Sequence, residues 1–81
     1  MATLRIPRLG ESIFEVGILR WLKRVGDRVA IDEPLVELET DKMDVVLPSP
    51  AAGVLSQIHA AEGQRVPIGS EVATIVEAEP T

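Results

Sequence analysis

The chain has 81 residues, which is enough for one domain and too few for two. Its net charge of −5 argues against nucleic acid and anionic membrane surfaces as partners, and the absence of cysteine excludes disulfides, thiolate metal sites and a cysteine nucleophile. Aromatic residues make up only 2% of the chain while hydrophobic residues make up 46%, so branched aliphatic side chains dominate, which favours a sheet-rich interior over an enzyme cleft.

The sequence repeats itself with a period of about 37 residues. Residues 17–19 match residues 53–55, and residues 26–31 match residues 63–68. A solenoid needs at least three such copies, and only two are present. The repeat therefore predicts a closed β structure with pseudo-two-fold symmetry.

The first element that breaks the symmetry lies near the start of the chain. Ten positions separate Pro7 from Gly17, whereas five separate Pro48 from Gly53, so the first copy carries an insertion. An insertion in a tight repeat is typical of a surface loop, and such loops often carry function, although a tolerated loop without a role is the alternative. The candidate recognition residues are Leu9, Gly10, Glu11, Ser12, Ile13 and Phe14.

The following segments read as strands. Residues 21–23 are strand-like, residues 36–39 alternate apolar and acidic side chains, and residues 44–47 form a strand that stops at Pro48. Residues 72–76 repeat the pattern of residues 35–39. We expect an all-β fold, a flattened barrel or sandwich of two antiparallel sheets. Turns or tight backbone are expected at Gly17, Gly26, Gly53 and Gly63.

A short polar turn containing Lys42 separates two of these strands, which puts the lysine at a hairpin tip. Its amine must lose a proton before it can attack an activated carboxylate, a step that a modifying enzyme can arrange. Taken alone, an exposed lysine in a turn usually has no role beyond solvation. The position of Lys42 in the repeat corresponds to Glu79, so the lysine and the end of the chain are expected at opposite ends of the barrel.

The residues around Lys42 carry a family resemblance. Residues 39–42 read Glu-Thr-Asp-Lys, and after a strand residues 48–53 read Pro-Ser-Pro-Ala-Ala-Gly. This run resembles the lipoyl-attachment motif of the 2-oxo acid dehydrogenase acyltransferases. Residues 9–12, 21–23, 25–27 and 32–38 also resemble the lipoyl domains of that family. The resemblance covers residues 4–76, and we expect a lipoyl domain over residues 1–77 and the start of an inter-domain linker at residues 78–81.

The resemblance implies a carrier that itself catalyses nothing. Lys42 would form an amide with lipoate through a lipoate-attaching ligase, with Asp41 and Met43 as flanking recognition residues. The other implied partners are a thiamine-diphosphate-dependent 2-oxo acid decarboxylase that acylates the lipoyl arm, an acyltransferase core that passes the acyl group to coenzyme A, and a dihydrolipoyl dehydrogenase. Residues 9–14 would help the decarboxylase to recognise the domain. Because the chain lacks cysteine, the only exchangeable disulfide would be that of the cofactor.

Two alternatives to a lipoyl domain stay open. Lipoyl domains usually have a small or β-branched residue after the lysine. Biotin carrier domains, which share the fold of lipoyl domains, typically read Met-Lys-Met, and Met43 matches the last residue of that motif. Asp41 and the inserted loop favour lipoate, because biotin carriers have methionine before the lysine and generally lack the loop. The second alternative is an unmodified adaptor domain of the same barrel shape, as in some membrane-fusion proteins.

Other residues offer weaker candidates. His59 has no second histidine and no cysteine to form a metal site with it, so no metal is expected. Trp21 is expected in core packing. No apolar run approaches the roughly 20 residues of a membrane helix, and residues 1–5 lack a basic and apolar leader, so a cytoplasmic location is expected, or the mitochondrial matrix if a targeting peptide was removed.

Overall fold

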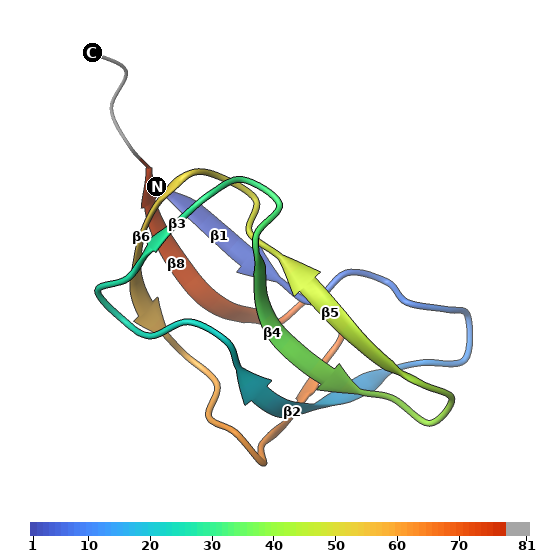
Figure 1. Cartoon of the computed structure of the whole chain (residues 1–81). Helices are drawn as coiled ribbons and strands as arrows, with labels where there is room; N and C mark the ends of the chain where they lie inside the picture. Colours follow the sequence, from blue (N-terminus) through green and yellow to red (C-terminus); the bar gives the residue numbers. More distant parts are fainter. Residues whose placement is uncertain (78–81) are drawn as a thin grey trace.

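This computed structural model describes residues 1–77. This range contains eight strands joined by turns and loops, and none of its residues is helical. Figure 1 shows how the strands are arranged. In chain order the strands are β1 (Ala2–Arg5), β2 (Glu15–Trp21), β3 (Arg28–Val29), β4 (Pro34–Glu39), β5 (Asp44–Pro48), β6 (Gly53–Ile58), β7 (Arg65–Pro67) and β8 (Glu71–Glu77). Within the described residues, no helix is long and apolar enough to cross a membrane.

The strands form two four-stranded antiparallel sheets related by the repeat. One sheet has the order β1-β8-β6-β3 and the other β5-β4-β2-β7. Exchanging each strand of one half with its counterpart in the other half (β1 with β5, β2 with β6, β3 with β7 and β4 with β8) converts the first order into the second. The predicted all-β sandwich with pseudo-two-fold symmetry is confirmed.

The core lies between the two sheets and is built from equivalent residues of the two halves. β4 buries Leu35, Val36 and Leu38 completely. The equivalent strand β8 does the same with Val72, Ala73 and Ile75. Two consecutive residues turn inward on β4 because the register between β4 and β5 shifts between Pro34 and Val36, and such a bulge breaks the strict alternation of a strand. The alternation predicted for residues 36–39 is therefore correct, and Leu35 is an added inward residue.

Two predicted glycine turns are confirmed. Gly26 and Gly63 have φ values of 98° and 88°, a region that side chains other than glycine rarely adopt. Their backbone N–H groups donate equivalent 2.8 Å hydrogen bonds, from Gly26 to the Leu55 carbonyl and from Gly63 to the Ile18 carbonyl. Each turn thereby connects one half of the repeat to a strand of the other.

The other two predicted glycine sites lie inside strands. A Cβ atom at Gly53 would lie 2.0 Å from the Val76 carbonyl oxygen, so the expected tight backbone is present there. At Gly17 the expectation is wrong, because a Cβ atom would have no neighbour nearer than Arg65 Nη1, at 3.7 Å, and the residue lies within β2.

The strand expected over residues 21–23 ends earlier than predicted. β2 stops at Trp21, and the Leu22 N–H makes a last hydrogen bond of 2.8 Å to the Leu35 carbonyl. The chain then reverses in a turn closed by the Asp27 N–H and the Arg24 carbonyl, at 2.9 Å. This turn places Lys23 in a loop, where the apolar Trp-Leu run had suggested a strand.

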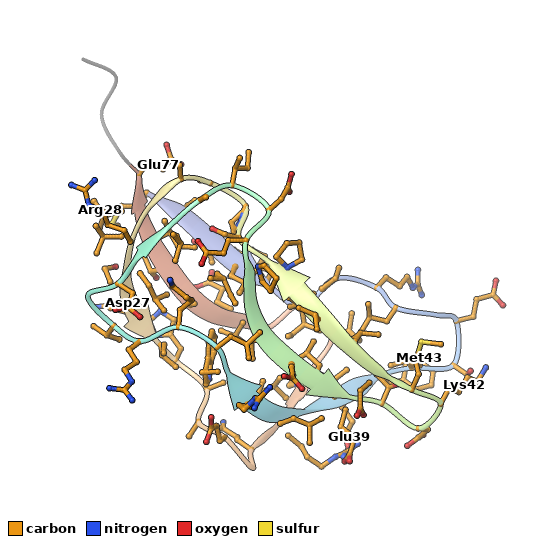
Figure 2. The ribbon with its side chains drawn as sticks, in the orientation of Figure 1. Asp27, Arg28, Glu39, Lys42, Met43 and Glu77 are labelled. Carbon is orange, nitrogen blue, oxygen red and sulfur yellow. The ribbon has the colours of Figure 1, made fainter. Side chains whose placement is uncertain are left out.

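The molecule is elongated, with principal extents of 43 × 22 × 17 Å. The hairpin tip that holds Lys42 lies at one end, and Glu77 lies at the other (Figures 1 and 2). The expected separation of the lysine from the outgoing chain therefore holds for the last described residue. Glu79 and the predicted linker at residues 78–81 lie outside the described residues.

Candidate functional site

The candidate site is the turn of residues 40–43 between β4 and β5. The two strands pair in register up to Glu39 and Asp44, so the four residues beyond this pair project past the sheet. Lys42 and Met43 lie at the tip of the hairpin (Figure 2), and both are exposed, Met43 by 64% of its surface. The predicted position of Lys42 is confirmed.

The turn is held together by the Thr40 hydroxyl. Thr40 Oγ1 accepts hydrogen bonds from the N–H groups of Met43, at 3.1 Å, and Lys42, at 3.3 Å. It donates to the Met43 carbonyl at 2.6 Å, and the Thr40 N–H donates to the same carbonyl at 3.1 Å. The turn is thus ordered while its lysine side chain stays outside the network.

The two lysines differ in their surroundings. Lys23 forms an ion pair with Glu33, with 3.0 Å between Nζ and Oε2, and its side chain is only 26% exposed. A hydrogen bond from the Ala30 N–H, together with Lys23, lowers the pKa of the Glu33 carboxyl, so this carboxyl is ionised at neutral pH. Lys42 has no ion pair among residues 1–77. The Lys42 amine is therefore the more accessible of the two.

Next to the turn, the guanidinium of Arg65 lies near the acidic side chains of Glu15, Glu39 and Asp41. The sequence analysis did not single out this arginine. Arg65 on β7 and Glu39 on β4 both pair with Gly17 on β2. Because Gly17 has no side chain, the guanidinium of Arg65 lies over it, and Nε donates to Glu15 Oε1 at 2.8 Å. Glu15, and to a smaller degree Asp41 and Glu39, raise the pKa of Arg65. The alternation of acidic and apolar residues could have indicated the acids, but Arg65 is 50 positions from Glu15.

The inserted loop lies between β1 and β2, at the hairpin end of the molecule (Figure 1). Leu9 and Ile13 are half-buried and pack against the core. Gly10, Glu11, Ser12 and Phe14 are exposed, Phe14 by 74%. The structure therefore divides the six candidate recognition residues into two that anchor the loop and four that present a surface.

The weaker candidates have structural partners. Trp21 is partly buried, and its Nε1 donates to the Ala60 carbonyl at 2.8 Å. His59 Nε2 lies 3.0 Å from Thr74 Oγ1. Within residues 1–77, no group of three His, Cys, Asp or Glu side chains could hold a metal ion.

Comparison with known proteins agrees with this geometry. The family model described as "Biotin-requiring enzyme" (Biotin_lipoyl) matches residues 2–75. The solution structure of the lipoyl domain of the 2-oxoglutarate dehydrogenase complex from Azotobacter vinelandii superposes with a TM-score of 0.80 and 30% identity, covering 98% of this chain and all of that one. The chain belongs to the biotinyl/lipoyl family and is a lipoyl domain. The family and fold expected from the sequence are confirmed.

Relatives of this lipoyl domain are components of 2-oxo acid dehydrogenase complexes. The acetyltransferase component of the pyruvate dehydrogenase complex of Mycobacterium tuberculosis is 56% identical over 70 residues, 86% of this chain and 13% of the relative. The succinyltransferase component of the 2-oxoglutarate dehydrogenase complex of Bartonella vinsonii is 50% identical over 72 residues, 89% of this chain and 18% of the relative. The lipoyl domain thus spans less than a fifth of the length of these relatives.

Proposed function

We propose that this lipoyl domain carries lipoate in amide linkage to Lys42. The observation that carries the proposal is the exposed Lys42 amine, free of ion pairs among residues 1–77, on an ordered turn at one end of the barrel. The structure fits the group, because an attached chain would extend from the hairpin tip without displacing a side chain of the core. Attachment by a lipoate-attaching ligase would also remove the positive charge of Lys42, which lies between Asp41 and Asp44 in the turn.

The proposed partners are supported by the relatives' membership of 2-oxo acid dehydrogenase complexes. When bound, lipoate would accept an acyl group from a thiamine-diphosphate-dependent 2-oxo acid decarboxylase, deliver it to coenzyme A at an acyltransferase core and be reoxidised by dihydrolipoyl dehydrogenase. The chain's own part is to hold the arm away from the outgoing end of the domain, since Glu77 lies at the opposite end from Lys42. The relatives come from complexes for pyruvate and for 2-oxoglutarate, so the proposal extends to the 2-oxo acid class.

Lipoate is favoured over biotin by Asp41. Its carboxylate is exposed beside Lys42, and a ligase pocket shaped for the methionine of biotin carriers would have to bury that charge unpaired, which costs several kcal/mol. Met43 is the feature that favours biotin, but its flexible apolar side chain is more easily accommodated by a lipoate ligase.

The test is to coexpress the chain with a lipoate ligase or a biotin ligase and to measure the intact mass. We expect one lipoyl group on the wild type, none on Lys42→Ala, and one on the control Lys23→Ala. Lys42→Ala should fold as the wild type does, because the side chain makes no contact with the core. Lipoylation of Lys42→Ala would place the site elsewhere, and a wild type that accepts neither group would favour an adaptor domain.

The same experiment separates lipoate from biotin. Asp41→Met recreates the Met-Lys-Met of biotin carriers, so this variant should gain partial biotinylation that the wild type lacks. Efficient biotinylation of the wild type without lipoylation would overturn the proposed function.

A further inference from the structure

The turn that presents Lys42 is closed by a side chain and not by the backbone alone. A tight turn commonly has a hydrogen bond from the N–H of its fourth residue to the carbonyl of its first. Among residues 1–77, the Met43 N–H bonds to Thr40 Oγ1 at 3.1 Å, and no backbone bond from Met43 N–H to the Thr40 carbonyl is present. The Lys42 N–H likewise uses Thr40 Oγ1, at 3.3 Å.

The hydroxyl of Thr40 is used to its full capacity. A hydroxyl offers one donor proton and two acceptor lone pairs. Thr40 Oγ1 donates to the Met43 carbonyl at 2.6 Å and accepts the two N–H groups of Lys42 and Met43. Loss of the hydroxyl would leave both N–H groups to water, and only the bond from the Thr40 N–H to the Met43 carbonyl, at 3.1 Å, would still close the turn.

The barrel itself does not need this network. All of the hydroxyl's hydrogen bonds lie within residues 40–43, beyond the last strand pair of β4 and β5. The repeat places Glu77, the last residue of β8, at the position equivalent to Thr40. The order that Thr40 imposes is therefore confined to the segment that holds the lysine.

We propose that Thr40 is a positioning residue for the attachment reaction at Lys42. Its hydroxyl keeps the turn in the closed form, in which Lys42 projects from a fixed backbone, and the ligase binds that form. When only a fraction of the molecules is in the competent form, the apparent affinity falls by that fraction, while the rate at saturation is unaffected. This inference rests on the proposed function of Lys42 as the lipoate site.

The test compares Thr40→Val, which removes the hydroxyl at nearly constant shape, with Thr40→Ser, which retains it. The control Ser56→Ala removes a hydroxyl that donates to the Thr74 carbonyl at 3.1 Å in the other sheet. Initial rates of lipoylation by a lipoate ligase are measured against the concentration of the unmodified chain. For Thr40→Val we expect KM to rise by about fivefold with kcat unchanged, since the turn loses hydrogen bonds of ordinary strength. Thr40→Ser and Ser56→Ala should match the wild type.

Amide hydrogen exchange in the unmodified chain gives a readout that does not depend on any ligase. The Lys42 and Met43 amides should exchange at least about fivefold faster in Thr40→Val, while the amides of β4 and β5 stay protected and the thermal midpoint falls by no more than about 8 °C. Unchanged KM and unchanged exchange in Thr40→Val would overturn the inference, as would loss of the fold or a fall in kcat alone. A wild type that is not lipoylated would instead refute the proposed function, while the exchange measurement would still decide whether Thr40 closes the turn.

Discussion

Gly17 and Gly53 match in the sequence repeat, but the strand register pairs Gly17 with Glu39 and Gly53 with Glu77, one residue out of step in the repeat, and their surroundings differ. At Gly53 a Cβ atom would lie 2.0 Å from the Val76 carbonyl oxygen and 2.8 Å from its carbonyl carbon. Those atoms belong to the end of β8, where Val76 pairs with Val54 of β6 and the ladder with β1 has ended at Ile75. At Gly17 the nearest atom would belong to the flexible end of Arg65, at 3.7 Å. The same residue type is thus required for close backbone approach at one site only.

This difference predicts unequal costs for the same substitution. Gly53→Ala should lower the free energy of unfolding by about 2 kcal/mol or more, because the paired backbone of β6 and β8 must move apart. Gly17→Ala should change it by less than about 1 kcal/mol, because the added methyl group meets only ordinary contacts. Urea denaturation followed by circular dichroism measures both values. Similar losses for the two variants would contradict the close approach at Gly53.

At the scale of the element, the inserted loop between β1 and β2 has some residues that pack on the core and others that are exposed to solvent. Leu9 and Ile13 pack on the core, and the Ile68 N–H holds the end of the loop through a 2.9 Å bond to the Phe14 carbonyl. Phe14 itself extends a large apolar side chain into solvent near the hairpin end. Exposed aromatic side chains on an ordered loop are common anchors for partner proteins.

Substitutions in the loop should therefore separate recognition from stability. Phe14→Ala should slow reductive acylation of the lipoylated chain by the decarboxylase by about fivefold or more, with an unchanged thermal midpoint, because a contact is lost only in the complex. Ile13→Ala should lower the free energy of unfolding by about 1 to 2 kcal/mol, because it removes half-buried apolar surface. Acyl transfer is followed by intact mass. An acylation rate for Phe14→Ala equal to that of the wild type would exclude Phe14 from recognition.

At the scale of the whole molecule, neither half of the repeat forms a sheet by itself. Each sheet takes two strands from the first half and two from the second, and both sheets cover one core. Trp21, the only tryptophan, links the halves, since it ends β2 and its Nε1 donates to the Ala60 carbonyl after β6. Partial structures in which one half is folded would expose most of the core.

We therefore expect a single cooperative unfolding transition. Tryptophan fluorescence, which reports the contact between the halves, and far-ultraviolet circular dichroism, which reports the strands, should have the same midpoint in urea. A fluorescence transition that clearly precedes the loss of strand signal would show that one half persists without the other.

The sequence by itself determined the features that local pattern and repetition encode. Alternation in residues 36–39 predicted β4, the prolines after residue 47 marked the end of β5, and the repeat predicted the pseudo-two-fold symmetry and the glycine turns at 26 and 63. Lys42 at the hairpin tip followed from a turn between two strands, which depends only on neighbouring residues.

Tertiary structure decided the features that depend on residues far apart in the chain. Arg65 reaches Glu15 because β7 pairs with β2 across Gly17, and Gly53 is crowded because β8 returns beside β6. The burial of Ile13 in the loop and the pairing of Lys23 with Glu33 arise in the same way. Local periodicity reports which face of a strand is apolar, but the partner on that face is chosen only when the two sheets close on one core.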